Sequence, residues 1–373
     1  MAVISSNDFQ NVALAISAYS DEAYTSERKL NSTGIVGSNA DINDSGESFI
    51  GQMRYYKPLS ATINVANLTS ATDGTYTDIS TDIMNYVKSV RTVGSEEVNM
   101  QQVISKQDGL AKLARDFAEV RAQDEHNALL SCLKGVALSE VTLGDNGGSG
   151  NGGLTAFTTD VDAANTGLFV DINDIGEFGA AATGAGDERK LFDSTAAGAA
   201  RGERLFKAVG MAFKDYEPDF MYLVTSPEVM AQMRAANLID QTIVEDGNLE
   251  FQTIFAGKFR LVLTRADQMI SGAAAGDLNA RSTKCSFVVK PGAMTYAPIS
   301  TPIPVEIDRT AASYAGGGST RVWYRYGMIM HPMGYTWAGS TSAFATNTNY
   351  GTAASWTRKM SALNLGILPI FHS

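Results

Sequence analysis

The clearest pattern in the sequence is a stripe of apolar residues at helical spacing between about Ser105 and Val136. Leucine, alanine, phenylalanine and valine recur at steps of three and four, with Leu113 and Phe117 on the apolar face. Charged residues fill the other face. About 30 residues at 1.5 Å each make a helix of roughly 45 Å, which is well above the usual length in globular proteins. The pattern therefore predicts a long scaffold helix with a buried apolar face.

The first hundred residues contain two segments with no obvious core of their own. An amphipathic helix is predicted near the N-terminus, and a connector rich in Gly, Ser, Asn and Asp follows at 31–48. A polar β-hairpin is predicted next, with Asp73-Gly74 at its turn and a return strand over 86–98. Because an isolated hairpin is marginally stable, we expect both segments to pack on a partner surface. The apolar positions concerned are Phe9, Val12, Ile16 and Tyr19 in the helix and Ile63 and Val65 in the hairpin.

The remainder of the chain predicts a mixed α/β region followed by two long strands. The α/β region contains helices over 199–213 and 226–238, the second with Ser226 as N-cap and Pro227 in its first turn. Its strands are predicted over 220–224, 259–264 and 285–289, and the long strands over 303–309 and 321–331. The segment after Gly339 is polar and closes on an apolar run at 363–371.

Composition and charge narrow the function. Forty acidic against 29 basic residues give a net charge of −11, which disfavours an electrostatic grip on nucleic acid or an anionic membrane. No apolar run approaches the ~20 residues of a membrane span, and the first residues lack the basic and apolar regions of a signal peptide. Two cysteines, Cys132 and Cys285, cannot form a disulfide framework. We therefore expect a soluble intracellular protein without a disulfide.

Motifs for catalysis or cofactor binding are incomplete. The spacing of Gly179 and Gly184 fits a phosphate-binding loop, but Ala185 stands where the lysine belongs. His126, His331 and His372 have no local catalytic signature around them; we expect His126 at a solvated or interface position, His331 bonded to backbone and His372 in a tail. The cysteines are interpreted as small buried apolar residues. The sequence thus predicts no catalytic residue, no cofactor and no metal site.

Three segments in order carry a resemblance to a known family. They are Leu129–Val136 at the end of the long helix, the strand-then-helix step at 220–227, and the closing strands, which end in His331-Pro332-Met333-Gly334-Tyr335-Thr336-Trp337. Together with the arm, the β-excursion and the long helix, they resemble the major capsid proteins of tailed phages with the Hong Kong 97-type fold.

The resemblance implies an α+β fold of five parts. These are an N-arm at 1–48, an E-loop hairpin at 49–100, a P-domain with the long spine helix at 101–195 and strands at 300–338, an α/β A-domain at 196–299, and a C-terminal extension at 339–373. It also implies subunits that form hexamers and pentamers and self-assemble in the host cytoplasm into an icosahedral virion capsid around phage DNA, without sequence-specific DNA binding and without a membrane. Separate scaffolding, portal and decoration proteins are possible partners.

Assembly contacts are expected at Phe9, Val12, Ile16, Tyr19, Lys57, Ile63, Val65 and Tyr314. Some members of the family join an E-loop lysine to an asparagine of another subunit. Nothing in the sequence marks an acidic catalyst for Lys57, so we expect no such cross-link.

Two alternative functions are kept open. An encapsulin-type compartment would share the fold but enclose protein cargo. An enzyme of unknown class would need an acid–base pair converging in a pocket.

Overall fold

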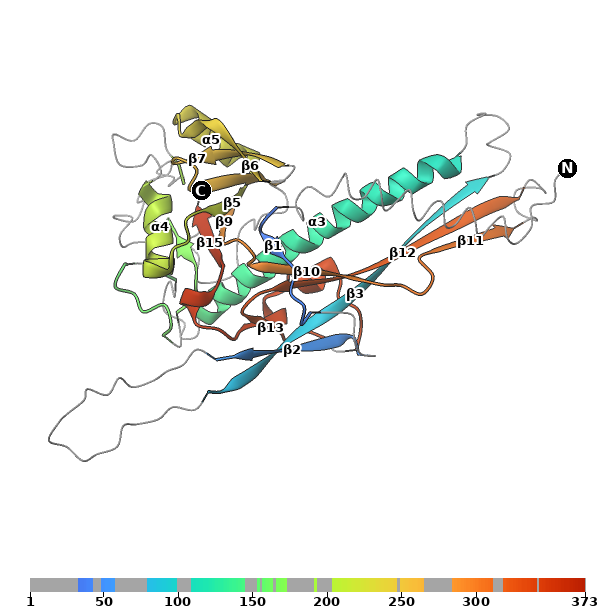
Figure 1. The fold of residues 1–373 in the computed structure, drawn as a ribbon, viewed down its shortest axis with the longest axis horizontal. Helices are drawn as coiled ribbons and strands as arrows, with labels where there is room; N and C mark the ends of the chain where they lie inside the picture. Colours follow the sequence, from blue (N-terminus) through green and yellow to red (C-terminus); the bar gives the residue numbers. More distant parts are fainter. Residues whose placement is uncertain are drawn as a thin grey trace, which may run out of the picture.

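The structure of the 373-residue chain is a computed structural model. It describes residues 33–42, 48–57, 79–98, 109–144, 153–154, 156–163, 166–172, 191–192, 203–246, 249–264, 284–310, 318–340 and 342–372. The predicted N-terminal helix, the strand around Ile63 and Val65, and the tip with Tyr314 lie outside these residues. Figure 1 shows an elongated molecule with two large sheets and one long helix between them, and a pair of short strands forms a third, two-stranded sheet.

The first sheet has six strands in the order β1–β10–β12–β3–β2, and β11 pairs with β12 as the sixth. Its strands are β1 (Val36–Gly37), β2 (Ile50–Tyr56), β3 (Thr81–Val98), β10 (Met294–Ile299), β11 (Val305–Thr310) and β12 (Ser319–Pro332). The antiparallel pairing of β3 with β12 runs from Val98 opposite Ser319 to Lys88 opposite Ile329. Strand β12 therefore pairs with three other strands of the sheet, β10, β11 and β3. The two long closing strands predicted over 303–309 and 321–331 correspond to β11 and β12.

The return strand of the predicted excursion belongs largely to this sheet. We expected a segment with little to bury, but Met84, Tyr86 and Val87 of β3 are buried. Met84 and Tyr86 share a cluster with Met53 of β2 and Ile329 of β12, and Val87 belongs to the main core. Asn85, Lys88 and Ser89 interrupt the alternation of apolar and polar residues in β3. For this reason the sequence did not predict that β3 is paired with strands on both sides.

Helix α3 (Gly109–Gly144) has 36 residues and is about 54 Å long at 1.5 Å per residue. It confirms the predicted long helix and extends past Val136, where the predicted stripe ends. A side chain at Gly135 would lie 2.0 Å from the Tyr350 carbonyl oxygen. The glycine therefore permits a close approach of α3 to the C-terminal segment and does not stop the helix. Phe117 is buried and Leu113 partly buried against β11 and β12, as the apolar stripe predicted.

The second sheet has seven strands in the order β4–β15–β9–β5–β8–β7–β6. These strands are β4 (Val170–Asp171), β5 (Met221–Thr225), β6 (Ile239–Asp246), β7 (Leu249–Ile254), β8 (Phe259–Leu263), β9 (Lys284–Val289) and β15 (Ile367–His372). Helices α4 (Glu203–Phe213) and α5 (Pro227–Ala235) pack beside it, and the short η1 (Lys214–Tyr216) follows α4. Ser226 is the N-cap of α5 and Pro227 opens it, so the predicted strand-then-helix step is confirmed.

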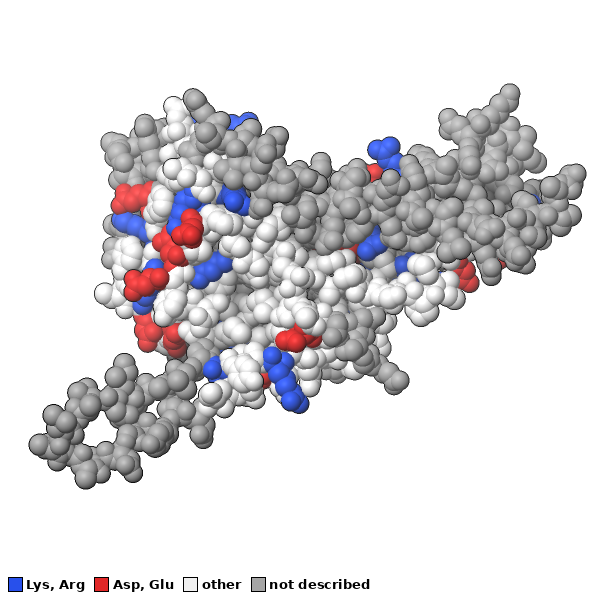
Figure 2. Space-filling model, viewed as in Figure 1, with Lys and Arg blue, Asp and Glu red and all other residues white. Residues whose placement is uncertain are grey.

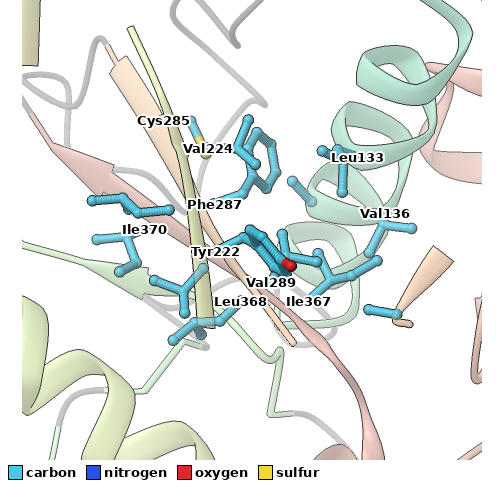
Figure 3. Packing of buried hydrophobic residues seen from close by; sticks show 14 of the residues in the cluster. Leu133, Val136, Tyr222, Val224, Cys285, Phe287, Val289, Ile367, Leu368 and Ile370 are labelled. Carbon is cyan, nitrogen blue, oxygen red and sulfur yellow. The ribbon is translucent and has the colours of Figure 1, made fainter. Parts of the chain in front are cut away.

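The C-terminal half of α3 enters the core of this second sheet. Figure 3 shows Leu133 and Val136 of α3 facing residues of β5, β9 and β15, among them Val224, Phe287 and Ile367. The apolar core is therefore continuous from the helix into the sheet. This continuity holds the seven-stranded unit at one end of α3.

The segment 339–373, expected as a C-terminal extension, contributes a central strand. All six residues of β15 are buried, between β4 and β9. The chain reaches β15 through β13 (Tyr335–Trp337), α6 (Asn347–Tyr350), η3 (Ala353–Ser355), β14 (Trp356–Arg358) and η4 (Ala362–Asn364). Trp337, Tyr350 and Trp356 form a ring cluster with centroids 5.2–6.3 Å apart. Three widely spaced aromatic residues thus anchor a stretch whose average composition is polar.

Candidate assembly surfaces and their support

Three carboxylates of α3 join the helix to the surrounding strands. The first is Asp124, which accepts hydrogen bonds from the Tyr326 hydroxyl at 3.0 Å and from the Asn347 side-chain amide at 2.9 Å. Arg91 of β3 forms an ion pair with Asp124 at 3.4 Å and donates to the Asn347 oxygen at 2.9 Å. One carboxylate therefore connects α3 to β12, β3 and α6.

The adjacent Glu125 is fully buried. It accepts a hydrogen bond of 2.9 Å from the Tyr296 hydroxyl of β10 and one of 3.3 Å from Arg121, one turn earlier. Arg121 also donates to the Tyr324 hydroxyl of β12 at 2.9 Å. A buried charge is tolerated when it is paired and hydrogen-bonded, and these contacts meet that requirement.

The third carboxylate is Glu140, near the C-terminal end of α3, with 1% of its surface exposed. It accepts hydrogen bonds from the Leu168 backbone N–H at 2.7 Å, the Tyr335 hydroxyl at 3.0 Å and Arg358 at 3.3 Å. Burial raises the pKa of the Glu140 carboxyl, and the charge of Arg358 and the two other donors oppose that rise. Glu140 therefore ties α3 to β13, to β14 and to the 166–172 segment.

The histidines occupy different places from those expected. Both ring nitrogens of His331 are buried without a hydrogen-bond partner, so the expected bond to backbone is wrong, and burial lowers the pKa of His331 to about 4. His372 is fully buried in β15 and was expected in a tail. Its Nε2 lies 2.9 Å from the Ser286 hydroxyl oxygen, which lies 2.8 Å from that of Thr225. His126, on α3, is partly buried.

This arrangement does not resemble a working nucleophile site. The Thr225–Ser286–His372 line joins three neighbouring strands and has no exposed surface at Thr225, Ser286 or His372. Cys132 and Cys285 are free and buried, and burial raises the pKa of each thiol. A thiol held in its neutral form is a poor nucleophile. These groups are therefore best explained as internal packing and hydrogen bonding.

Within the described residues, no group of three or more His, Cys, Asp or Glu side chains is arranged to hold a metal ion. Among the helices in those ranges, none combines the length and apolarity needed to cross a membrane.

Lys57 is the one predicted contact residue within the described ranges. It is exposed at the end of β2 and lies 3.4 Å from a carboxylate oxygen of Asp82. Lys359 lies 3.7 Å from the same oxygen. The Ile83 backbone N–H, together with the two lysines, lowers the pKa of Asp82, so Asp82 is a carboxylate that pairs with Lys57.

Exposed apolar side chains mark surfaces that the sequence reasoning missed. Tyr56 and Ile79, at the end of β2 and just before β3, are 75% and 76% exposed, and Tyr216 beside α4 is 62% exposed. Trp323 of β12 and Ile303, two residues before β11, are also exposed. The strand alternation around Ile79, Thr81 and Ile83 was a signal that could have identified one outward-facing apolar stripe.

Comparisons with known proteins gave structural similarity alone. No protein-family model matches the sequence, and no curated protein matches it. The chain is similar to the cyanophage Pam1 capsid asymmetric unit, with a TM-score of 0.47 and 13% identity over 91% of this chain and 89% of that one. It is similar to the capsid of Ralstonia phage GP4, with a TM-score of 0.47 and 11% identity over 92% and 89%. It is also similar to the capsid of cyanophage P-SCSP1u, with a TM-score of 0.46 and 10% identity over 90% and 89%. The helices and sheets described above make the chain an α+β protein.

Proposed function

We propose that the chain is a major capsid protein that self-assembles into the icosahedral shell of a tailed phage. Copies form hexamers and pentamers, and these capsomers enclose genomic DNA. The role is structural and not enzymatic. Within the virion its main partner is a further copy of itself, and separate scaffolding, portal or decoration proteins act with it.

The observation that carries the proposal is the fixed, extended scaffold built on α3. A helix of 36 residues is held along the six-stranded sheet by Asp124 and Glu125, and Glu140 ties it to β13 and β14. Its C-terminal half is part of the core of the seven-stranded sheet. Exposed apolar side chains are consequently held at separate, fixed places on an elongated body. Closed assemblies need contact surfaces whose relative orientation is fixed.

In the terms of the family, α3 serves as the spine helix and the six-stranded sheet as the P-domain. The seven-stranded sheet serves as the A-domain, with β15 supplied from the predicted C-terminal extension. Strands β2 and β3 form the base of the E-loop hairpin. The acidic net charge of −11 suits a shell that surrounds DNA without binding it tightly.

Expression of the chain, followed by sedimentation velocity and negative-stain microscopy, tests the proposal. We expect closed particles, or capsomers that close when scaffolding protein from the same genome is added. The nucleic acid and protein content of particles from infected cells separates the capsid from an encapsulin-type compartment. A chain that stays monomeric at high concentration with scaffolding protein present would contradict a capsid role.

A further inference from the structure

The exposed face of the β2–β3 base is apolar and positively charged. Arg54 and Tyr56 alternate with the buried Met53 on β2, so they share the outward face. Arg54 is paired across the strands with Ile83, which is 38% exposed, and Ile79 lies two residues before Thr81 on the same side. We call Arg54, Tyr56, Ile79 and Ile83 the hairpin-base patch.

The charge of this patch is not neutralised within the described chain. Asp82 lies on the opposite face of the ribbon, where it pairs with Lys57 and Lys359. Arg54 is exposed and has no acidic partner among the described residues. A cation beside three exposed apolar side chains is a surface that fits an acidic partner with an apolar centre.

A surface of that kind lies on the seven-stranded unit, directly after α4. Tyr216 is 62% exposed and is flanked by the exposed Asp215 and Asp219. Neither aspartate has a cationic partner in the part of the chain that the structure describes. Glu217, between them, pairs with Lys258 at 3.0 Å, and Lys214 donates to the Thr159 carbonyl oxygen at 3.2 Å. We call Asp215, Tyr216 and Asp219 the acidic turn.

The two surfaces lie on different parts of one molecule. In Figure 1, β2 and the end of β3 that pairs with it lie low in the view, and α4, which leads into the acidic turn, lies on the left. Figure 2 shows acidic and basic side chains interspersed over that left-hand unit. The unpaired aspartates, and not the overall charge of the unit, therefore distinguish the acidic turn from its surroundings.

We propose that the hairpin-base patch of one copy binds the acidic turn of a second copy. Arg54 would pair with Asp215 or Asp219, and Tyr56 and Ile83 would pack around Tyr216. Because the two surfaces differ, the contact is head-to-tail, and repetition of such a contact closes into a ring when the rotation between copies allows it. The inference rests on the proposed shell function and names the surfaces that join neighbouring subunits in a capsomer.

Charge reversal and its compensation test the contact. Arg54→Glu alone, and Asp215→Lys with Asp219→Lys, should each raise the concentration needed for assembly about tenfold or more, the factor that corresponds to 1.4 kcal/mol per subunit. The triple variant should recover most of the wild-type assembly, since each copy then presents both reversed surfaces. Arg234→Glu on the exposed face of α5 is the matched control for basic reversal, and Glu119→Lys on α3 for acidic reversal.

The outcomes separate this inference from the function on which it rests. If wild-type protein assembles and Arg54→Glu assembles equally well, the contact is wrong and the shell function stands. Loss of assembly by both single-surface variants without recovery in the triple variant would also overturn the pairing. A lowered melting temperature of the isolated Arg54→Glu subunit would show that a segment of its own chain covers the patch. Failure of wild-type protein to assemble would contradict the proposed function itself.

Discussion

The two large sheets of the molecule, with six and seven strands, are stabilised in different ways. The seven-stranded unit has a largely apolar interior with a buried polar line of Thr225, Ser286 and His372, and the buried acidic residue among its described side chains, Asp171, lies on the edge strand β4. Where α3 meets the six-stranded sheet, Asp124 and Glu125 face arginine and tyrosine donors, and further along the helix Glu140 faces Tyr335 of β13 and Arg358 of β14. The two regions therefore differ in how directional their stabilising contacts are: apolar packing in the seven-stranded unit, and charged hydrogen bonds around α3.

Apolar packing alone leaves a long helix several positions of similar energy along a sheet, because burial is not directional. Charged hydrogen bonds have defined geometry, and a misplaced buried charge is costly. We expect the carboxylates of α3 to fix the helix at one position along the sheet. We expect no comparable role for buried charges in the seven-stranded unit, because backbone hydrogen bonds already fix the positions of its strands.

The largest effect on stability is expected from removing the carboxylate of Glu140, which joins α3 to β13 and β14. Glu140→Ala leaves Arg358 and two further donors without their acceptor and should lower the free energy of unfolding by about 3–5 kcal/mol. Glu140→Gln keeps an acceptor oxygen and should cost less. Urea unfolding followed by circular dichroism measures both.

The matched change in the seven-stranded unit is Ser286→Ala. It breaks a buried line of side-chain hydrogen bonds that contains no carboxylate, with an expected cost of about 1–2 kcal/mol. A Ser286→Ala cost equal to or above that of Glu140→Ala would mean that the two regions do not differ in the way we describe.

The same substitution in two helices gives the second comparison. At Gly135 of α3, a new methyl group would lie 2.0 Å from the Tyr350 carbonyl oxygen and 2.7 Å from the Trp356 indole nitrogen, so Gly135→Ala should destabilise the protein by about 1–3 kcal/mol. At Gly210 of α4, the nearest atom is a ring carbon of Phe157 at 3.1 Å, and Phe157 is 46% exposed and free to shift. Gly210→Ala should therefore be neutral or stabilising by up to about 1 kcal/mol, as helix propensity favours alanine. Thermal unfolding of both variants measures the difference between the two sites. Equal melting temperatures would argue against close packing at Gly135.

A smaller effect is expected from acid. His331 has a pKa of about 4 in the folded state against an ordinary 6.5, because its ring is buried. The unfolded chain therefore binds the proton more readily, and stability falls as the pH decreases from about 6.5 toward 4. The loss should be about 1 kcal/mol at about pH 5.5. His331→Leu should remove this component of the pH dependence, and an unchanged slope in the variant would assign the effect to other groups.

The smallest effect is expected at the surface. Lys57→Met removes an exposed ion pair with Asp82, and such pairs contribute little to stability. We expect the melting temperature to stay within about 2 °C. Boiled wild-type particles should also run as a single monomer-sized band on a denaturing gel; a ladder of larger bands would show that subunits are cross-linked.

Several elements could be predicted from local sequence because each depends on residues close together in the chain. The stripe through Leu113 and Phe117 predicted α3, and Ser226-Pro227 predicted the start of α5. The strand predicted over 321–331 corresponds to β12. In each case the periodicity or the cap is a local property, so no tertiary information was needed.

The candidate surfaces were less accessible to sequence reasoning. Of the predicted contact residues, Lys57 alone falls within the described part of the chain, and the contacts proposed for the others stay predictions. Arg54, Ile79 and Tyr216 were missed, because exposure depends on which face of a strand or turn the rest of the fold covers. An isolated Tyr or Ile gives no sign of that.

The sequence by itself determined the long helix, the start of α5 at Ser226-Pro227, the closing strands and an acidic chain without motifs for catalysis. The tertiary structure alone decided that β15 lies between β4 and β9, that Gly135 admits Tyr350 and Trp356, and that Asp124, Glu125 and Glu140 face donors up to about 220 residues away in the chain. The physical reason is the range of the interactions. Helix and turn signals act between neighbouring residues, whereas strand order and the pairing of buried charges depend on distant segments that the chain brings together only on folding.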